Sequence, residues 1–196
     1  MKYDRKKALN IILDAAKNYK DKLCDFHFKI VYLKNGKQEY AYIGFRDNNF
    51  LHLTGVKSKL SAQRFYEASL NGKLSLYDFE IDKQGKVQRK LEVLPYLHDL
   101  LYNSCMIGDF INSGIVIKSD YFVGNTRAML SVGFRYGKST DIPVSLYNED
   151  IRKLTKPTCK VLLIQRKLYN EKEYTYITYL AKDYELRNGN LVKIAR

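Results

Sequence analysis

The chain has 196 residues and a formal net charge of +13, from 34 Lys and Arg against 21 Asp and Glu. A field of this size favours nucleic acid or another acidic partner; the alternative is a Lys-rich and Tyr-rich composition with no polyanion bound. No apolar run approaches the roughly 18 residues that would span a bilayer, and the N-terminus is amphipathic instead of signal-like. We therefore expect a cytoplasmic protein with no membrane partner.

Three cysteines, Cys24, Cys105 and Cys159, lie far apart in the sequence and form no CxxC pair. Disulfide frameworks and structural zinc sites depend on closely spaced ligands, so we expect three small thiols, no metal and no cofactor. Walker-type, GxSxG, HExxH and Rossmann motifs are also missing from the sequence. NTP hydrolysis and zinc-dependent hydrolysis are therefore disfavoured.

The first half of the chain mixes helical and strand patterns. Apolar residues spaced by three and four predict a helix from about residue 4 to 23. Two alternating segments, FHFKIVYLK and QEYAYIGF, flank Asn35–Gly36 and predict a β-hairpin. The short apolar run Phe50 to Leu53 is interpreted as a strand, and Ser61 as the N-cap of a helix that ends at Asn71–Gly72.

The second half is dominated by strand patterns. A helix with Pro95 near its start is followed by the segments GIVIKSDYFVG, AMLSVGFRYG, IPVSLY, KVLLIQRKLYN and YTYITYLAKDY, and by a small hairpin around Asn188–Gly189. We predict one α+β domain over residues 1–196, with N-terminal helices packed on a curved, mostly antiparallel, RNase-like sheet. Its parts are the N-terminal helix (1–24), the hairpin, HLTG strand and helices (25–103), and the antiparallel sheet region (104–196).

The three histidines differ in their surroundings. His27 lies in an alternating strand, where it is structural or on the open face, and His98 lies on a helix beside Asp99. His52 lies between two leucines, so in a strand His52 and Thr54 would share the face opposite the leucines. Gly55 then permits close backbone approach, and Lys57, Lys59 and Arg64 surround the start of the next helix with positive charge. The alternative is a structural histidine beside a turn.

RNA cleavage without metal needs a base for the 2′-OH proton, a cation for the phosphorane and an acid for the leaving oxygen. We predict His52, Thr54 and Arg135 as catalytic residues. Nucleic-acid contacts are assigned to Lys57, Lys59, Arg64, Ser145, Tyr176 and Thr178. Arg127 and Arg166 are further candidate cations, and the scarce carboxylates do not favour a metal-dependent nuclease.

Six segments together resemble a known family: NFLHLTGV, RFYEASLNGKL, VLPYLHDLL, IGDF, IPVSL and EDIRKL. The family is the fourth phage-associated variety of the barnase–EndoU–colicin–RelE-like nucleases, and the similarity covers roughly residues 40 to 182. The resemblance implies a metal-independent RNase-like fold, carried by phages or mobile elements as a toxin or effector in a host bacterial cytoplasm. The motif's histidine corresponds to His52, with Thr54 beside it.

Three hypotheses follow. The first is an endoribonuclease that acts on RNA or a ribonucleoprotein, with a cognate inhibitor or target protein. The second is an inhibitor that binds nucleic acid or nucleoprotein with little activity alone, for example an anti-CRISPR protein that binds a guide RNA–effector complex. The third is an ADP-ribosyltransferase-like effector, which would need a catalytic glutamate from among Glu171, Glu173 and Glu185.

Overall fold

The N-terminal helix is the longest helix among the described residues. A computed structural model describes residues 4–82, 84–111 and 118–194. In it α1 (Arg5–Lys22) has Asp4 as its N-cap, and the Asp4 carboxylate accepts a hydrogen bond from Lys7 N at 2.7 Å. The apolar stripe of α1 is buried and consists of Ala8, Ile12, Ala15, Ala16 and Tyr19. The predicted helix is confirmed.

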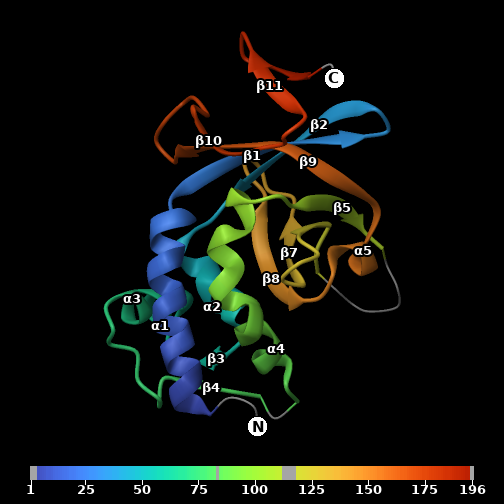
Figure 1. Ribbon diagram of the computed structural model, residues 1–196. Coiled ribbons are helices and arrows are strands. Elements are labelled where there is room, and N and C mark those ends of the chain that lie inside the picture. Colours follow the sequence, from blue (N-terminus) through green and yellow to red (C-terminus); the bar gives the residue numbers. More distant parts are fainter. Residues whose placement is uncertain (1–3, 83, 112–117, 195–196) are drawn as a thin grey trace.

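A curved antiparallel sheet packs beside the helices (Figure 1). Its strands run in the spatial order β2, β1, β9, β5, β6, β7, β8, and β10 adds to one edge of β9. Their bounds are β1 Phe26–Lys34, β2 Lys37–Gly44, β5 Met106–Phe110, β6 Tyr121–Gly124, β7 Leu130–Arg135, β8 Ile142–Asn148, β9 Thr155–Leu168 and β10 Tyr176–Leu180. The predicted α+β class and the hairpin at Asn35–Gly36 are confirmed. The part of a predicted strand at residues 114–117 lies outside the described residues.

The two faces of β1 have different surroundings. Phe28 and Ile30 are fully buried in the main core, which includes the inner stripe of α1. His27, Lys29 and Val31 alternate with them and therefore project from the opposite face. A small hairpin, β11 (Tyr184–Arg187) with β12 (Asn190–Lys193), covers only the Val31 end of that face. Helices thus cover one face of this part of the sheet, and the other face is largely open.

The sheet curls until its two edge strands meet at one point. Gly44 N donates to Asp141 O at 3.0 Å, and Asp141 N donates to Tyr42 O at 2.7 Å. Ile43 and Asp141 thereby form a single parallel bridge between β2 and the start of β8. The sheet is therefore strongly curved without a continuous closing ladder.

The expected strand at Phe50 to Leu53 is wrong. These residues form the helix α2 (Phe50–Thr54), which follows the 3₁₀ helix η1 (Asp47–Asn49) and ends at Gly55 with φ +76°. Phe50, Leu53 and Thr54 are buried while His52 is exposed, so burial follows the i, i+3, i+4 spacing of a helix. A run of four apolar residues does not distinguish the two structures by itself.

The remaining elements lie mainly on the helical side of the molecule. They are β3 (Lys57–Ser58), α3 (Ala62–Leu70), β4 (Phe79–Glu80), α4 (Lys86–Val93), η2 (Leu94–Tyr102) and α5 (Ile151–Leu154). Ser61 is the N-cap of α3 as predicted, since its Oγ accepts from Arg64 N at 3.3 Å. The expected helix around Pro95 is a 3₁₀ helix instead, and α4 before it was not expected. No helix among the described residues is long and apolar enough to cross a membrane.

We predict that Gly55→Ala is more destabilising than Gly72→Ala. Both glycines have positive φ, +76° and +68°, where an alanine costs about 1–2 kcal/mol. A Cβ on Gly55 would also lie 2.5 Å from Cδ of Lys90, whereas a Cβ on Gly72 meets nothing within 4 Å. Urea denaturation of both variants measures the difference. Equal losses would contradict the packing of Lys90 against the end of α2.

Candidate nucleic-acid interface

The residues predicted for catalysis are not joined in one cluster. Thr54 is fully buried, and its hydroxyl donates to Leu51 O at 2.7 Å and accepts from Val56 N. His52 is exposed on α2, so His52 and Thr54 do not share an open face. Arg135 is exposed at the end of β7, opposite Ile142. Within the described part of the chain, no hydrogen bond or ion pair joins Arg135 to His52 or Thr54. The catalytic role of His52 itself stays a prediction.

A lysine that the sequence did not single out lies beside His52. Lys90 Nζ, on α4, donates to His52 O at 3.1 Å and to Ser145 Oγ at 3.0 Å. Burial lowers the pKa of Lys90 to about 8. An amine with such a pKa can exchange protons near neutral pH, so His52, Lys90 and Ser145 form a candidate site for proton transfer. Ser145, which the sequence assigned to nucleic-acid contacts, is here a hydrogen-bond partner of Lys90.

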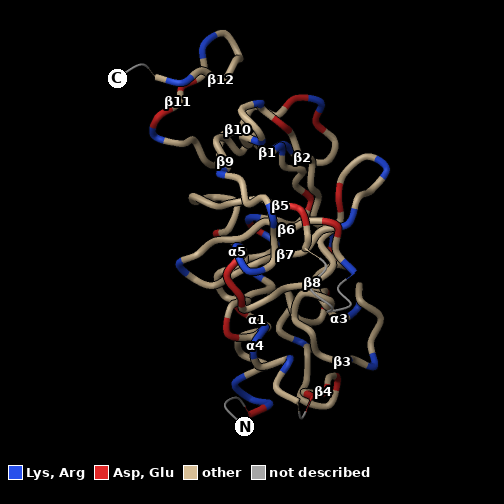
Figure 2. The backbone as a smooth tube through the Cα atoms, turned by 90° about the vertical axis from the view of Figure 1, so that its right-hand side faces the viewer, with Lys and Arg blue, Asp and Glu red and all other residues tan. Residues whose placement is uncertain are grey.

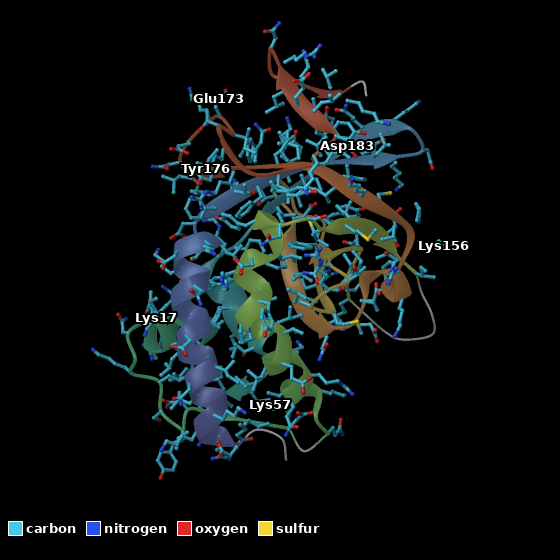
Figure 3. All side chains as sticks on the ribbon, in the orientation of Figure 1. Lys17, Lys57, Lys156, Glu173, Tyr176 and Asp183 are labelled. Carbon is cyan, nitrogen blue, oxygen red and sulfur yellow. The ribbon has the colours of Figure 1, made fainter. Side chains whose placement is uncertain are left out.

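The residues predicted to bind nucleic acid are spread over the molecule. Lys57 lies on β3 and Tyr176 on β10, at opposite ends of the molecule (Figure 3). Lys59 and Arg64 are exposed near Lys57. The hydroxyl of Thr178 donates to Leu101 O at 2.6 Å, which ties β10 to η2. Figure 2 shows Lys and Arg along the whole length of the chain, so net charge alone does not locate an interface.

The open face of β2, β1 and β9 does bring basic and aromatic side chains together. His27 lies directly opposite Gly44 on β2 and opposite Lys167 on β9. Directly opposed residues project from the same face, so the pairs Lys29–Tyr42 and Val31–Tyr40 extend this surface. We call it the His27 face; it comprises His27, Lys29, Tyr40, Tyr42, Gly44, Arg46, Lys167, Tyr169 and Tyr174.

Cations and rings alternate across the His27 face. Arg46 lies 3.8 Å from the ring centroid of Tyr169, and Lys29 lies 5.0 Å from that of Tyr40. Lys167 lies 5.2 Å from the ring centroid of Tyr174. Its ammonium also donates to Glu171 O at 2.5 Å. Interleaved rings and cations are what single-stranded nucleic acid requires, because rings stack on bases and cations contact phosphates.

His27 lies at the centre of this face, and its imidazole is buried. The residue is 8% exposed, and its Nε2 is buried with no hydrogen-bond partner. Burial, followed by the charges of Arg46 and Lys167, lowers the pKa of His27 below its ordinary value of 6.5. The imidazole is therefore neutral at neutral pH. A buried polar atom without a partner is costly in a native structure and points to a ligand.

Glycine at position 44 lets the β2 backbone approach the imidazole closely. A Cβ atom on Gly44 would lie 3.3 Å from His27 Nε2 and 2.9 Å from Thr140 Oγ1. The Tyr169 ring covers another side, with its centroid 5.0 Å from that of His27. Tyr169 is 54% exposed and Arg46 is also exposed. His27 is thus enclosed by a hydroxyl and by an aromatic–cation pair at the surface.

One sequence signal could have found part of this site. The turn at Asn35–Gly36 pairs Lys34 with Lys37, and continuing that register places His27 opposite Gly44. Lys167 comes from β9, more than a hundred residues away, so local pattern does not indicate it. All three cysteines are free and buried. The described residues contain no group of three His, Cys, Asp or Glu placed to hold a metal ion.

The fold and the His27 face together define an α+β protein with a basic, aromatic surface on one face of its antiparallel sheet. A family model described as phage-Barnase-EndoU-ColicinE5/D-RelE like nuclease 4 matches residues 11–183. The chain belongs to this phage-associated, nuclease-like family, and the match begins early enough to include His27. No curated protein and no solved structure matches the chain significantly.

We predict that His27 titrates below pH 6.5 and that Arg46→Gln or Lys167→Gln raises its pKa, because each removes a cation that disfavours imidazolium. The lowered pKa means that unfolded chains bind more protons than folded ones just below pH 6.5. Folding stability from this group is therefore lost as pH falls through that range. NMR titration of the imidazole, with Lys57→Gln as the matched control, measures the pKa. A wild-type value at or above 6.5 would contradict the assignment.

Proposed function

We propose that the protein is a metal-independent endoribonuclease, an effector of a phage or mobile element, and that it acts through the His27 face. The observation that carries the proposal is the buried, unpartnered Nε2 of His27 in the middle of a basic and aromatic surface. The family's description as nuclease-like supports the reaction class. Family members are likened to nucleases of several kinds, so the choice of RNA rests on the chemistry of the site.

The neutral imidazole of His27 is the base in this proposal. Its Nε2 accepts the proton of a ribose 2′-OH, and the 2′-oxygen then attacks the adjacent phosphorus. The leaving 5′-oxygen takes a proton, and the product ends in a 2′,3′-cyclic phosphate. The phenol of Tyr169, whose ring packs on His27, supplies that proton. DNA lacks the 2′-OH and is not cut by this route.

Arg46 and Lys167 supply the positive charge for this reaction. Both lie close enough to His27 to lower its pKa, and negative charge accumulates on the phosphoryl oxygens in the transition state. Fixed cations at that position stabilise the transition state more than the ground state. The hydroxyl of Thr140 also lies close to Gly44, which is directly opposite His27 in the sheet. The sequence predicted the same types of group, a histidine with cations and hydroxyls. In this proposal the histidine is His27 instead of His52, and the main cations are Arg46 and Lys167 instead of Arg135.

A second candidate function rests on how completely His27 is covered. Its Nε2 is not exposed to solvent while the Tyr169 ring packs against the imidazole, and Arg46 in turn lies over the Tyr169 ring. A protein that stays in this state binds RNA on the face without cutting it. Such a protein would act in the bacterial cytoplasm as an inhibitor of a nucleoprotein machine, for example a guide RNA–effector complex. Binding of a partner that displaces Tyr169 would convert one function into the other.

We predict that the purified protein cleaves single-stranded RNA in EDTA and that His27→Asn lowers kcat/KM by about 100- to 10,000-fold, the usual contribution of a general base. The rate should fall as pH drops through the lowered pKa of His27, because protonation removes the base. Arg46→Gln should raise the pH at which this fall in rate occurs, because it raises the pKa of His27. Gel analysis of labelled RNA over a pH series measures both effects.

His52→Asn and His98→Asn are the matched controls, since the chain has three histidines. Both should retain cleavage under the proposal. Loss of activity in His52→Asn alone, with an unchanged melting temperature, would assign catalysis to the cluster of His52, Lys90 and Ser145 instead.

We predict that RNA affinity falls steeply with salt and that the cations of the His27 face set the slope. Each phosphate contact on a single strand contributes about 0.7 to the slope of log K against log salt. A triple variant of Lys29, Arg46 and Lys167 to Gln should therefore reduce the slope by about 2. Fluorescence anisotropy at several salt concentrations measures it. The same charge change at Lys57, Lys59 and Arg64 is the control, and a larger reduction there would move the interface to the start of α3.

A further inference from the structure

The inner side of the curved sheet holds a cavity of about 300 Å³ beside the edge strand β2. Its floor contains the buried side chains of Ile107, Tyr121 and Cys159. At its mouth the side chain of Tyr136 is 68% exposed, and the edge strand β2 borders the cavity at residues 40–42. We call this cavity the tyrosine pocket, after Tyr121 in its floor and Tyr136 at its mouth. An apolar floor with an exposed ring at the mouth suits a flat ligand that stacks.

The charged groups of the tyrosine pocket favour a hydrogen-bond donor over a phosphate. Asp109 and Asp141 contribute two carboxylates and Lys34 one ammonium, so the local charge is negative in a strongly basic protein. Burial, followed by the charges of Asp109 and other carboxylates, raises the pKa of Tyr136. The field inside the pocket therefore repels phosphate and keeps that phenol neutral.

The two carboxylates are not equally available. Both oxygens of Asp141 are occupied, Oδ2 by the hydroxyl of Tyr121 at 2.7 Å and Oδ1 by Gly137 N at 3.1 Å. Asp109 Oδ2 accepts from Lys34 Nζ at 2.6 Å. Among the described hydrogen bonds, none uses Asp109 Oδ1, and a carboxylate oxygen keeps further lone pairs when it accepts one bond. Asp109 is thus the group to receive donors from a ligand.

The tyrosine pocket and the His27 face share β2. The segment of β2 that borders the pocket carries the rings of Tyr40 and Tyr42 on its other side, on the His27 face. There Lys29 lies 5.0 Å from the Tyr40 centroid, and the Tyr42 and Tyr174 centroids are 5.9 Å apart. A nucleotide with its phosphate on the cations of the face can therefore direct its base over β2 into the pocket. The two sites then hold parts of one strand.

We propose that the tyrosine pocket binds one unstacked guanine base of the RNA. The inference rests on the proposed function, because it assigns the pocket to the same substrate. Guanine presents two neighbouring donors, N1–H and the N2 amino group, which match the two acceptor oxygens of a carboxylate. Adenine and cytosine present one amino group, and uracil one N–H. Stacking on the Tyr136 ring accepts any base, so the hydrogen bonds to Asp109 select guanine.

Nucleoside 3′-monophosphates test the proposal without any cleavage step. Calorimetric titration of the whole chain with 3′-GMP, 3′-AMP, 3′-CMP and 3′-UMP should give affinity for 3′-GMP at least about tenfold above the others, the value of a good paired contact. Asp109→Asn should remove this preference, while Asp14→Asn, an exposed carboxylate on α1, should retain it. Tyr136→Ala, at a 68% exposed residue, should weaken all four ligands.

Each remaining outcome overturns the proposal. Equal affinity for the four nucleotides, or a guanine preference that survives Asp109→Asn, removes the assignment to guanine. Binding of spermidine that Asp109→Asn abolishes, with no nucleotide bound, makes the pocket a cation site instead. The proposed function fails separately: guanine bound in the pocket without RNA cleavage contradicts the nuclease alone, and cleavage without guanine binding contradicts the pocket alone.

Discussion

The pairing of β1 with β9 is the constraint on which both core and site depend. In this register Ile30 lies opposite Ile164 in the core, and His27 lies opposite Lys167 on the open face. A slip of one residue would exchange the faces, bringing His27 and Lys29 into the core and Phe28 to the surface. The fully buried Phe28 makes such a slip costly. The same hydrophobic preference that folds the sheet therefore fixes the imidazole beside two cations.

The state of His27 follows from where that register places it. Burial and then two neighbouring cations lower the pKa of the imidazole, so the ring is neutral at neutral pH. Placing it there costs folding free energy, since Nε2 has lost water without gaining a protein partner. Such a cost is expected at a functional site. Under the proposed function, RNA reaches the imidazole when the exposed Tyr169 ring beside it is displaced.

Sequence pattern predicted the elements whose signal is local. The helix up to residue 23, the hairpin at Asn35–Gly36 and the hairpin around Asn188–Gly189 follow from periodicity and turn residues. Phe50 to Leu53 was misassigned because this short run fits the period of a strand as well as that of a helix. In the structure the segment is a helix that ends at Gly55 in the left-handed conformation and buries Thr54. The site was harder to predict, because Lys167 reaches His27, and Lys90 reaches Ser145, only through long-range packing.

The central claim is that RNA lies on the His27 face with phosphate at Arg46 and Lys167. NMR of labelled protein bound to an oligoribonucleotide with one 2′-deoxy position, which cannot be cut there, tests it most directly. The account predicts the largest shifts at the His27 imidazole and at the Lys167 and Tyr169 side chains, with little change at His52. Shifts confined to His52 and the start of α3, with His27 unperturbed, would contradict it.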